Sequence, residues 1–190
     1  SMVGFLGGHG TYEMTDGTSV LKGDFYVGGA LTNTIGWGKL ETTGRYESAF
    51  IDLATSTVCR ATGLLRVTGG AFSLIGETGR LVFSDDGVGN LEIGATGLVS
   101  VKGLDFRNGR STARFVFGPS GVGTVTVSGD MAVSAGTKLE IDMSQCTAEQ
   151  GSFKLFDVGG TFQPFDENDI PLVGTKQCRV LQKMTGVELR

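Results

Sequence analysis

Two carboxylates in the C-terminal half of the chain have the spacing that acid–base catalysis uses. Glu140 and Asp142 alternate with apolar residues in the run Lys138-Leu139-Glu140-Ile141-Asp142. Because side chains of a strand alternate between faces, Lys138, Glu140 and Asp142 are expected on the outer face, with neighbours about 7 Å apart. This spacing suits a polysaccharide hydrolase or lyase. The same pattern is typical of a solvated strand face, and nothing here supplies the aromatic residues and long loops that grip sugar rings.

Few other residues offer catalytic or metal-binding chemistry. The single histidine, His9, lies in an N-terminal glycine run, so neither a Ser-His-Asp triad nor a histidine-based zinc site is expected. Asp85 and Asp86 precede Gly87 and offer carboxylate oxygens, which calcium prefers. The calcium-binding nonapeptide GGxGxDxUx does not occur, so an ordinary turn is the other interpretation. We expect no cofactor and no metal centre, and keep Asp85 and Asp86 as weak calcium candidates.

The three cysteines allow one disulfide. A bridge between Cys146 and Cys178 would tie the last strand to the rest of the domain. In the chain-entropy description it would stabilise the fold by about 3–4 kcal/mol. Such a bridge fits an oxidising compartment, and it leaves Cys59 either as a buried small hydrophobe or as a free thiol. Both the paired and the unpaired state of Cys146 and Cys178 stay open at this point.

Glycine dominates the composition, with 32 glycines among 190 residues against 3 prolines. The glycines follow no three-residue period, which excludes collagen, and 39% hydrophobic residues with 12 phenylalanines argue against disorder. No run approaches the roughly 18 apolar residues of a membrane span, so this segment is not expected to insert into a membrane. The formal net charge of −4 argues against general nucleic-acid binding. The length predicts one domain with a single core.

Short runs with apolar residues at every second position recur between the glycines. They are residues 24–27, 64–67, 80–83, 90–93, 98–101, 104–106, 114–117, 124–127 and 138–142. Each has the pattern of a half-buried strand. Strand starts follow one another at intervals as short as five or six residues, which leaves room only for tight corners and favours a solenoid over a sandwich. We expect an all-β fold, a parallel β-helix that is right-handed by base rate, with about 20–25 residues per coil.

Several segments resemble a known kind of repeat. They are Gly10-Thr11-Tyr12-Glu13-Met14-Thr15, Gly23-Asp24-Phe25-Tyr26-Val27-Gly28-Gly29, Gly89-Asn90-Leu91-Glu92-Ile93-Gly94 and Gly123-Thr124-Val125-Thr126-Val127-Ser128-Gly129. These are similar to the glycine-rich β-helix repeats of bacterial secreted proteins of the autotransporter-passenger type. The resemblance covers about residues 8–35 and 88–160, and the chain departs from it between Arg45 and Arg60. It implies a secreted or surface-displayed β-helix and says little about activity.

The chain divides into three parts. Residues 1–2 are interpreted as a residual cloning scar, residues 3–143 as β-helix coils, and residues 144–190 as C-terminal coils and a cap of the same domain. In the last part glycine thins and an acidic cluster precedes Pro171, as expected of atypical capping sequence over the open end of a stack. The runs 177–182 and 186–190 are expected to be closing strands. We expect a domain excised from a longer protein.

The sequence thus predicts a non-enzymatic structural or adhesive module that is secreted or at the cell surface. It would act as a stalk or bind polysaccharide or another surface polymer along a rod of stacked coils. One alternative is a polysaccharide-binding or polysaccharide-degrading β-helix centred on Glu140 and Asp142. A third hypothesis is a fibre-forming module that self-associates through the edge strands at its coil ends.

Overall fold

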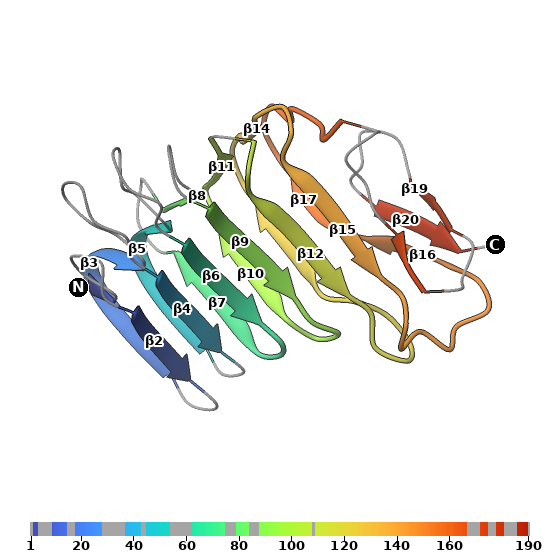
Figure 1. Ribbon diagram of the computed structural model, residues 1–190, viewed down its shortest axis with the longest axis horizontal. Coiled ribbons are helices and arrows are strands. Elements are labelled where there is room, and N and C mark those ends of the chain that lie inside the picture. The colour runs from blue at the N-terminus through green and yellow to red at the C-terminus, as the bar shows by residue number, and fades with distance from the viewer. Residues whose placement is uncertain are drawn as a thin grey trace.

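The computed structural model describes strands and connecting turns in twelve stretches of the chain. They are residues 2–3, 9–14, 18–27, 37–42, 45–53, 62–74, 79–83, 88–107, 109–166, 172–174, 178–180 and 186–189. The secondary structure of these residues is all β, with mostly parallel strands in stacked sheets (Figure 1). None of them belongs to a helix long and apolar enough to span a membrane.

One sheet has seven strands in its described part, all paired in parallel. In spatial order they are β2 (His9–Met14), β4 (Trp37–Thr42), β6 (Thr62–Val67), β9 (Val88–Ile93), β12 (Thr112–Val116), β15 (Lys138–Asp142) and β18 (Leu172–Val173). Asn90 pairs with Thr112, 22 residues later, whereas Ile141 pairs with Leu172, 31 residues later. Successive strands are therefore spaced unevenly, and the interval lies within the expected 20–25 residues at one place and exceeds it at the other.

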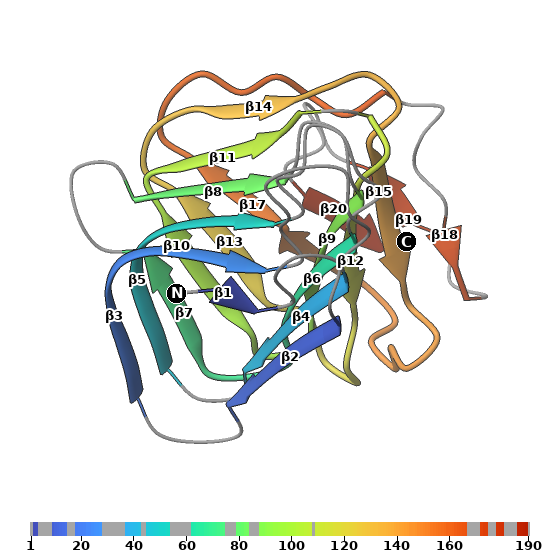
Figure 2. The ribbon, with the colours of Figure 1, turned by 60° about the vertical axis from the view of Figure 1, so that its left-hand side comes forward.

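The second sheet has ten strands in its described part and bends between two halves. One half holds β7 (Ala71–Leu74), β10 (Leu98–Val101), β13 (Thr124–Val127) and β17 (Phe156–Val158), and the other holds β8 (Arg80–Phe83), β11 (Gly103–Phe106) and β14 (Met131–Val133). The long strands β3 (Thr18–Val27) and β5 (Arg45–Leu53) complete it with β1 (Met2–Val3). β5 pairs with β7 through Arg45–Ser48 and with β8 through Phe50–Leu53, so it runs through both halves. Figure 2 shows the two halves facing different sides of the molecule.

The core fills the space between the sheets with rows of side chains in register. The seven-stranded sheet contributes Leu65, Leu91, Ala113 and Leu139 in one row and Val67, Ile93, Phe115 and Ile141 in the next. Alternate residues of β9 and β13 are buried, as period-2 patterning predicts. Phe83 and Phe106 stack with ring centroids 4.6 Å apart, and each buried phenylalanine contributes about 1.5–3 kcal/mol of transfer free energy.

Glycines at one corner are required by backbone geometry. Gly109 and Gly136 have φ angles of 67° and 87°, in the left-handed region that favours glycine. They lie in successive turns of the stack, and a Cβ on Gly109 would lie 2.0 Å from the Ala135 carbonyl oxygen. The corner therefore needs glycine both for its dihedral angles and for the close approach of neighbouring turns.

The C-terminal residues form a different kind of sheet. β16 (Gly151–Lys154), β20 (Gly186–Leu189) and β19 (Cys178–Val180) pair antiparallel, and Figure 1 places them at the C-terminal end of the stack. Leu189 is buried with the main core, and Phe153 meets Phe117 edge to face at 5.2 Å. Strands at the two closing runs predicted from the sequence are thus confirmed, while their antiparallel pairing was not anticipated.

Candidate functional site

The two carboxylates singled out by their spacing lie together at the end of β15. Leu139 and Ile141 are fully buried, so Lys138 and Glu140 face outward as predicted. Asp142 differs from Glu140 in its surroundings, since its side chain is only 9% exposed against 28% for Glu140. The alternation placed both acids correctly along the strand, but the shielding of Asp142 comes from a neighbouring strand.

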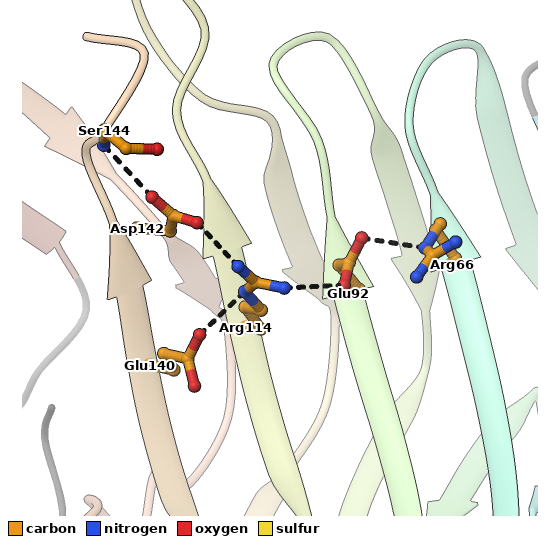
Figure 3. Close-up of polar contacts among 6 residues, drawn as sticks. All are labelled: Arg66, Glu92, Arg114, Glu140, Asp142 and Ser144. Atoms are coloured by element: carbon orange, nitrogen blue, oxygen red, sulfur yellow. Dashed lines mark hydrogen bonds and ion pairs between the residues drawn. The ribbon is translucent and has the colours of Figure 1, made fainter. Parts of the chain in front are cut away.

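That neighbour is Arg114 on β12, which contacts three carboxylates (Figure 3). Its Nη2 donates a 2.6 Å hydrogen bond to Asp142 Oδ2, and its Nε lies 2.7 Å from Glu140 Oε1. Its Nη1 lies 3.4 Å from Glu92 Oε2 on β9. Arg114 was not among the site residues predicted from sequence, because the strand spacing that brings it beside Glu140 is not regular.

Glu92 continues the contacts to β6 and completes a row that we call the charge ladder: Arg66, Glu92, Arg114 and Glu140, with Asp142 beside its end. Glu92 Oε1 lies 2.7 Å from Arg66 Nε. The row follows from parallel pairing, which sets Arg66 opposite Glu92, Glu92 opposite Arg114 and Arg114 opposite Glu140. The two Nε contacts are ion pairs and not aligned hydrogen bonds, because neither N–H points at its carboxylate oxygen.

The contacts between Arg114 and the carboxylates shift the pKa of two of these groups, Asp142 and Arg114. Desolvation by burial raises the pKa of the Asp142 carboxyl, but hydrogen bonds from Ser144 and Arg114 and the Arg114 charge outweigh it, and the pKa is lowered. The Ser144 amide donates one of these bonds at 3.0 Å. Burial also lowers the pKa of Arg114, but the bond to Asp142 and the charges of Glu140 and Glu92 raise it overall. Both groups are therefore held in their charged forms.

This arrangement is poorly matched to acid–base catalysis. A general acid needs a carboxyl whose pKa is raised toward the working pH, and the pKa of Asp142 moves the other way. Glu140 and Asp142 also bind the same guanidinium, so neither faces a substrate alone. The chemistry that the ladder supports is charge pairing across strands.

A shallow depression of about 280 Å³ lies beside the ladder on the outer face of the seven-stranded sheet. It is lined by Leu64, Asn90, Leu91, Glu92, Thr112 and Arg114. Asn90 and Thr112 face the depression, and the Asn90 side-chain oxygen accepts a 3.1 Å hydrogen bond from the Thr112 amide. The depression combines two leucines with hydrogen-bonding groups and paired charges, so its lining is both apolar and polar.

A second ion cluster, also absent from the sequence predictions, lies on the ten-stranded sheet. Asp105 on β11 has a side chain only 7% exposed, and Arg80 of β8 forms an ion pair with it. Arg107 Nε approaches the same carboxylate oxygen at 3.4 Å. The Arg80 side chain crosses Gly103 to reach Asp105, since a Cβ on Gly103 would lie 3.3 Å from Arg80 Cγ.

The other predicted site residues find no test in this structure. Asp85, Asp86 and Cys59 lie outside the described residues, as does the side chain of Cys178. Cys146 is buried and carries a free thiol here. Because the Cys178 side chain is not described, the disulfide between the two stays a prediction. In the described stretches no three His, Cys, Asp or Glu side chains gather where they would hold a metal ion.

Comparison of the chain with protein-family models, with curated proteins and with solved structures finds no match in any of the three.

Proposed function

We propose that this chain is a right-handed parallel β-helix that serves as a structural or adhesive module, secreted or at the cell surface. Strand order supports the β-helix: β6, β9 and β12 are each followed by two strands of the ten-stranded sheet before the chain returns to the seven-stranded sheet. A right-handed turn follows the general preference of crossovers between parallel strands. The terminal antiparallel sheet would then act as the C-terminal cap.

The observation that carries the functional proposal is the outward display of side chains in register. Arg66, Glu92, Arg114 and Glu140 occupy equivalent positions on neighbouring strands, which lie about 4.8 Å apart. A rod with such rows presents a regular surface to an extended polymer or holds other domains at a fixed spacing. The acids of this surface are already paired with arginine, which favours binding or support over catalysis.

A paired binding and hydrolysis assay tests the proposal. The intact chain is applied to immobilised neutral and acidic polysaccharides, and release of reducing sugar is followed in the same samples. Binding without release supports an adhesive module. Sugar release that disappears in Glu140→Gln and Asp142→Asn, but persists in Lys138→Gln on the same strand, would establish the enzyme instead. Binding to none of the polysaccharides would contradict the adhesive role, and the structural role as a stalk would remain as the proposal.

A further inference from the structure

A second depression, separate from the charge ladder, lies on the outer face of the ten-stranded sheet. It has a volume of about 350 Å³ and extends over β7, β10 and β13. Its polar lining consists of Ser73, Ser100, Thr126, Ser128 and Lys102. The residues that line it include four hydroxyls and one ammonium group but no carboxylate.

Three of the hydroxyls form a row across neighbouring strands. Ser73 pairs with Ser100, and Ser100 pairs with Thr126, so their side chains occupy equivalent outward positions. At a strand spacing of about 4.8 Å the row extends over roughly 10 Å. Each hydroxyl both donates and accepts hydrogen bonds, which matches the hydroxyl groups of a sugar chain.

Lys102 lies at the corner that directly follows β10, and two backbone hydrogen bonds fix its main chain. Its amide donates a 2.7 Å hydrogen bond to the Gly79 carbonyl, and its own carbonyl accepts a 2.8 Å bond from the Gly129 amide. The Lys102 side chain is exposed and forms no ion pair with any carboxylate in the described part of the chain. Lys102 thus presents an ammonium group from a backbone fixed by two hydrogen bonds, whereas the Arg114 guanidinium contacts three carboxylates.

Acidic positions bound the hydroxyl row at both ends. Glu47 of β5 holds the register position next to Ser73, and Asp157 of β17 the position next to Thr126. Asp157 is paired with Lys154 at 3.0 Å. Lys154 therefore neutralises the Asp157 carboxylate, and Lys102 is the cationic residue that lines the depression itself.

We propose that this face binds an acidic polysaccharide. A carboxylate or sulfate of the sugar chain would accept a charge-assisted hydrogen bond from Lys102 Nζ, and sugar hydroxyls would bond Ser73, Ser100 and Thr126. The inference rests on the proposed polymer-binding role, and it assigns that role a face and a ligand class.

The test measures binding of the intact chain to polygalacturonate, dextran sulfate and uncharged dextran at low ionic strength. Lys102→Glu should weaken binding to at least one of the two acidic polymers at least about tenfold, because it removes one charge-assisted hydrogen bond and places a carboxylate beside the anionic group of the ligand. Lys138→Glu is the matched control, because it makes the same charge change at an exposed lysine of the other sheet, and it should stay within about twofold of the wild type. A preference for polygalacturonate or for dextran sulfate distinguishes carboxylate from sulfate recognition.

Several results would overturn the inference. Equal weakening by Lys102→Glu and Lys138→Glu would show that only net charge matters. Binding to uncharged dextran as tight as to the acidic polymers would reject the ligand class while keeping the polymer-binding role. Binding to none of the three would also reject it, and the wider panel of polysaccharides then decides the proposed function separately. Thermal melts of both variants check that each remains folded.

Discussion

At the scale of single residues, the charged side chains differ in whether they contact a group of opposite charge. Arg114 joins Glu92, Glu140 and Asp142, whereas Lys102 on the other sheet has no carboxylate partner among the described residues. Arg114 thus links carboxylates of two neighbouring strands, and Lys102 presents its ammonium group in the second depression. Sequence alternation alone does not separate them, because it reports the face on which a residue lies and not the neighbours that parallel pairing brings beside it.

Arg114→Ala should destabilise the fold by about 1–3 kcal/mol. It leaves Glu140 and Asp142 without the guanidinium they share and Glu92 with Arg66 alone, and we place the effect below that of a fully buried pair because the Arg114 side chain is 38% exposed. Urea unfolding measures the change as a shift in midpoint at unchanged slope. Lys138→Ala, at an exposed residue that forms no ion pair with a described side chain, should change stability by less than about 0.5 kcal/mol. Equal effects of the two substitutions would mean that the ladder contributes nothing.

The stability that Asp142 adds should be lost in acid. Since its folded pKa lies below the ordinary value of 3.8, its contribution is complete above 3.8 and declines as the pH falls through the lower folded value. Wild type should therefore exceed Asp142→Asn in stability at neutral pH, and the gap should narrow below pH 3.8. Urea midpoints of both proteins across this range provide the measurement. A gap that stays constant or widens in acid would contradict the assigned direction.

At the scale of elements, many of the strands were predictable from sequence, whereas others, such as β4 and β5, and the pairing partners were not. The runs 98–101, 124–127 and 138–142 are strands β10, β13 and β15. Their register was hidden, because paired residues are 22 apart at Asn90 and Thr112 but 31 apart at Ile141 and Leu172. A ladder that depends on this register could not be found by searching for a constant repeat.

Removing an aromatic ring from the core should lower the free energy of unfolding far more than removing an exposed side chain from the preceding strand. Phe106→Ala on β11 deletes the stacking partner of Phe83 and opens a cavity, at an expected cost of about 3–5 kcal/mol. Leu98→Ala on β10 is the control, since Leu98 is 52% exposed, and its effect should stay within about 0.5 kcal/mol. Denaturant titration compares the two. A small loss for Phe106→Ala would place the ring outside the core.

Gly103 should be coupled energetically to the Arg80–Asp105 pair. A valine side chain at position 103 would occupy the space through which Arg80 reaches Asp105, so Gly103→Val should weaken that ion pair. A double-mutant cycle with Arg80→Ala measures the effect, and a coupling of at least about 0.5 kcal/mol is expected. Strictly additive free energies would show that Arg80 does not depend on the absence of a side chain at Gly103.

At the scale of the whole molecule, one stack of parallel strands carries two different outer faces. The seven-stranded sheet shows paired charges, and the ten-stranded sheet shows hydroxyls beside Lys102. Glycine content and short alternating runs indicated an all-β fold with stacked strands, and this much is confirmed. The two faces were not predicted, because they depend on which residues from distant parts of the chain become neighbours.

The measurement that tests this account most directly is the pattern of inter-strand contacts in an NMR spectrum of the labelled protein. Parallel stacking predicts backbone cross-peaks that join Arg114 to the neighbourhoods of both Glu92 and Glu140, and Ser100 to those of Ser73 and Thr126. Strong Hα–Hα cross-peaks between strands adjacent in sequence, such as β10 and β11, would mark antiparallel hairpins, whose facing Cα atoms approach to about 4.5 Å. That result would contradict the stacked rows and the two outer faces derived from them.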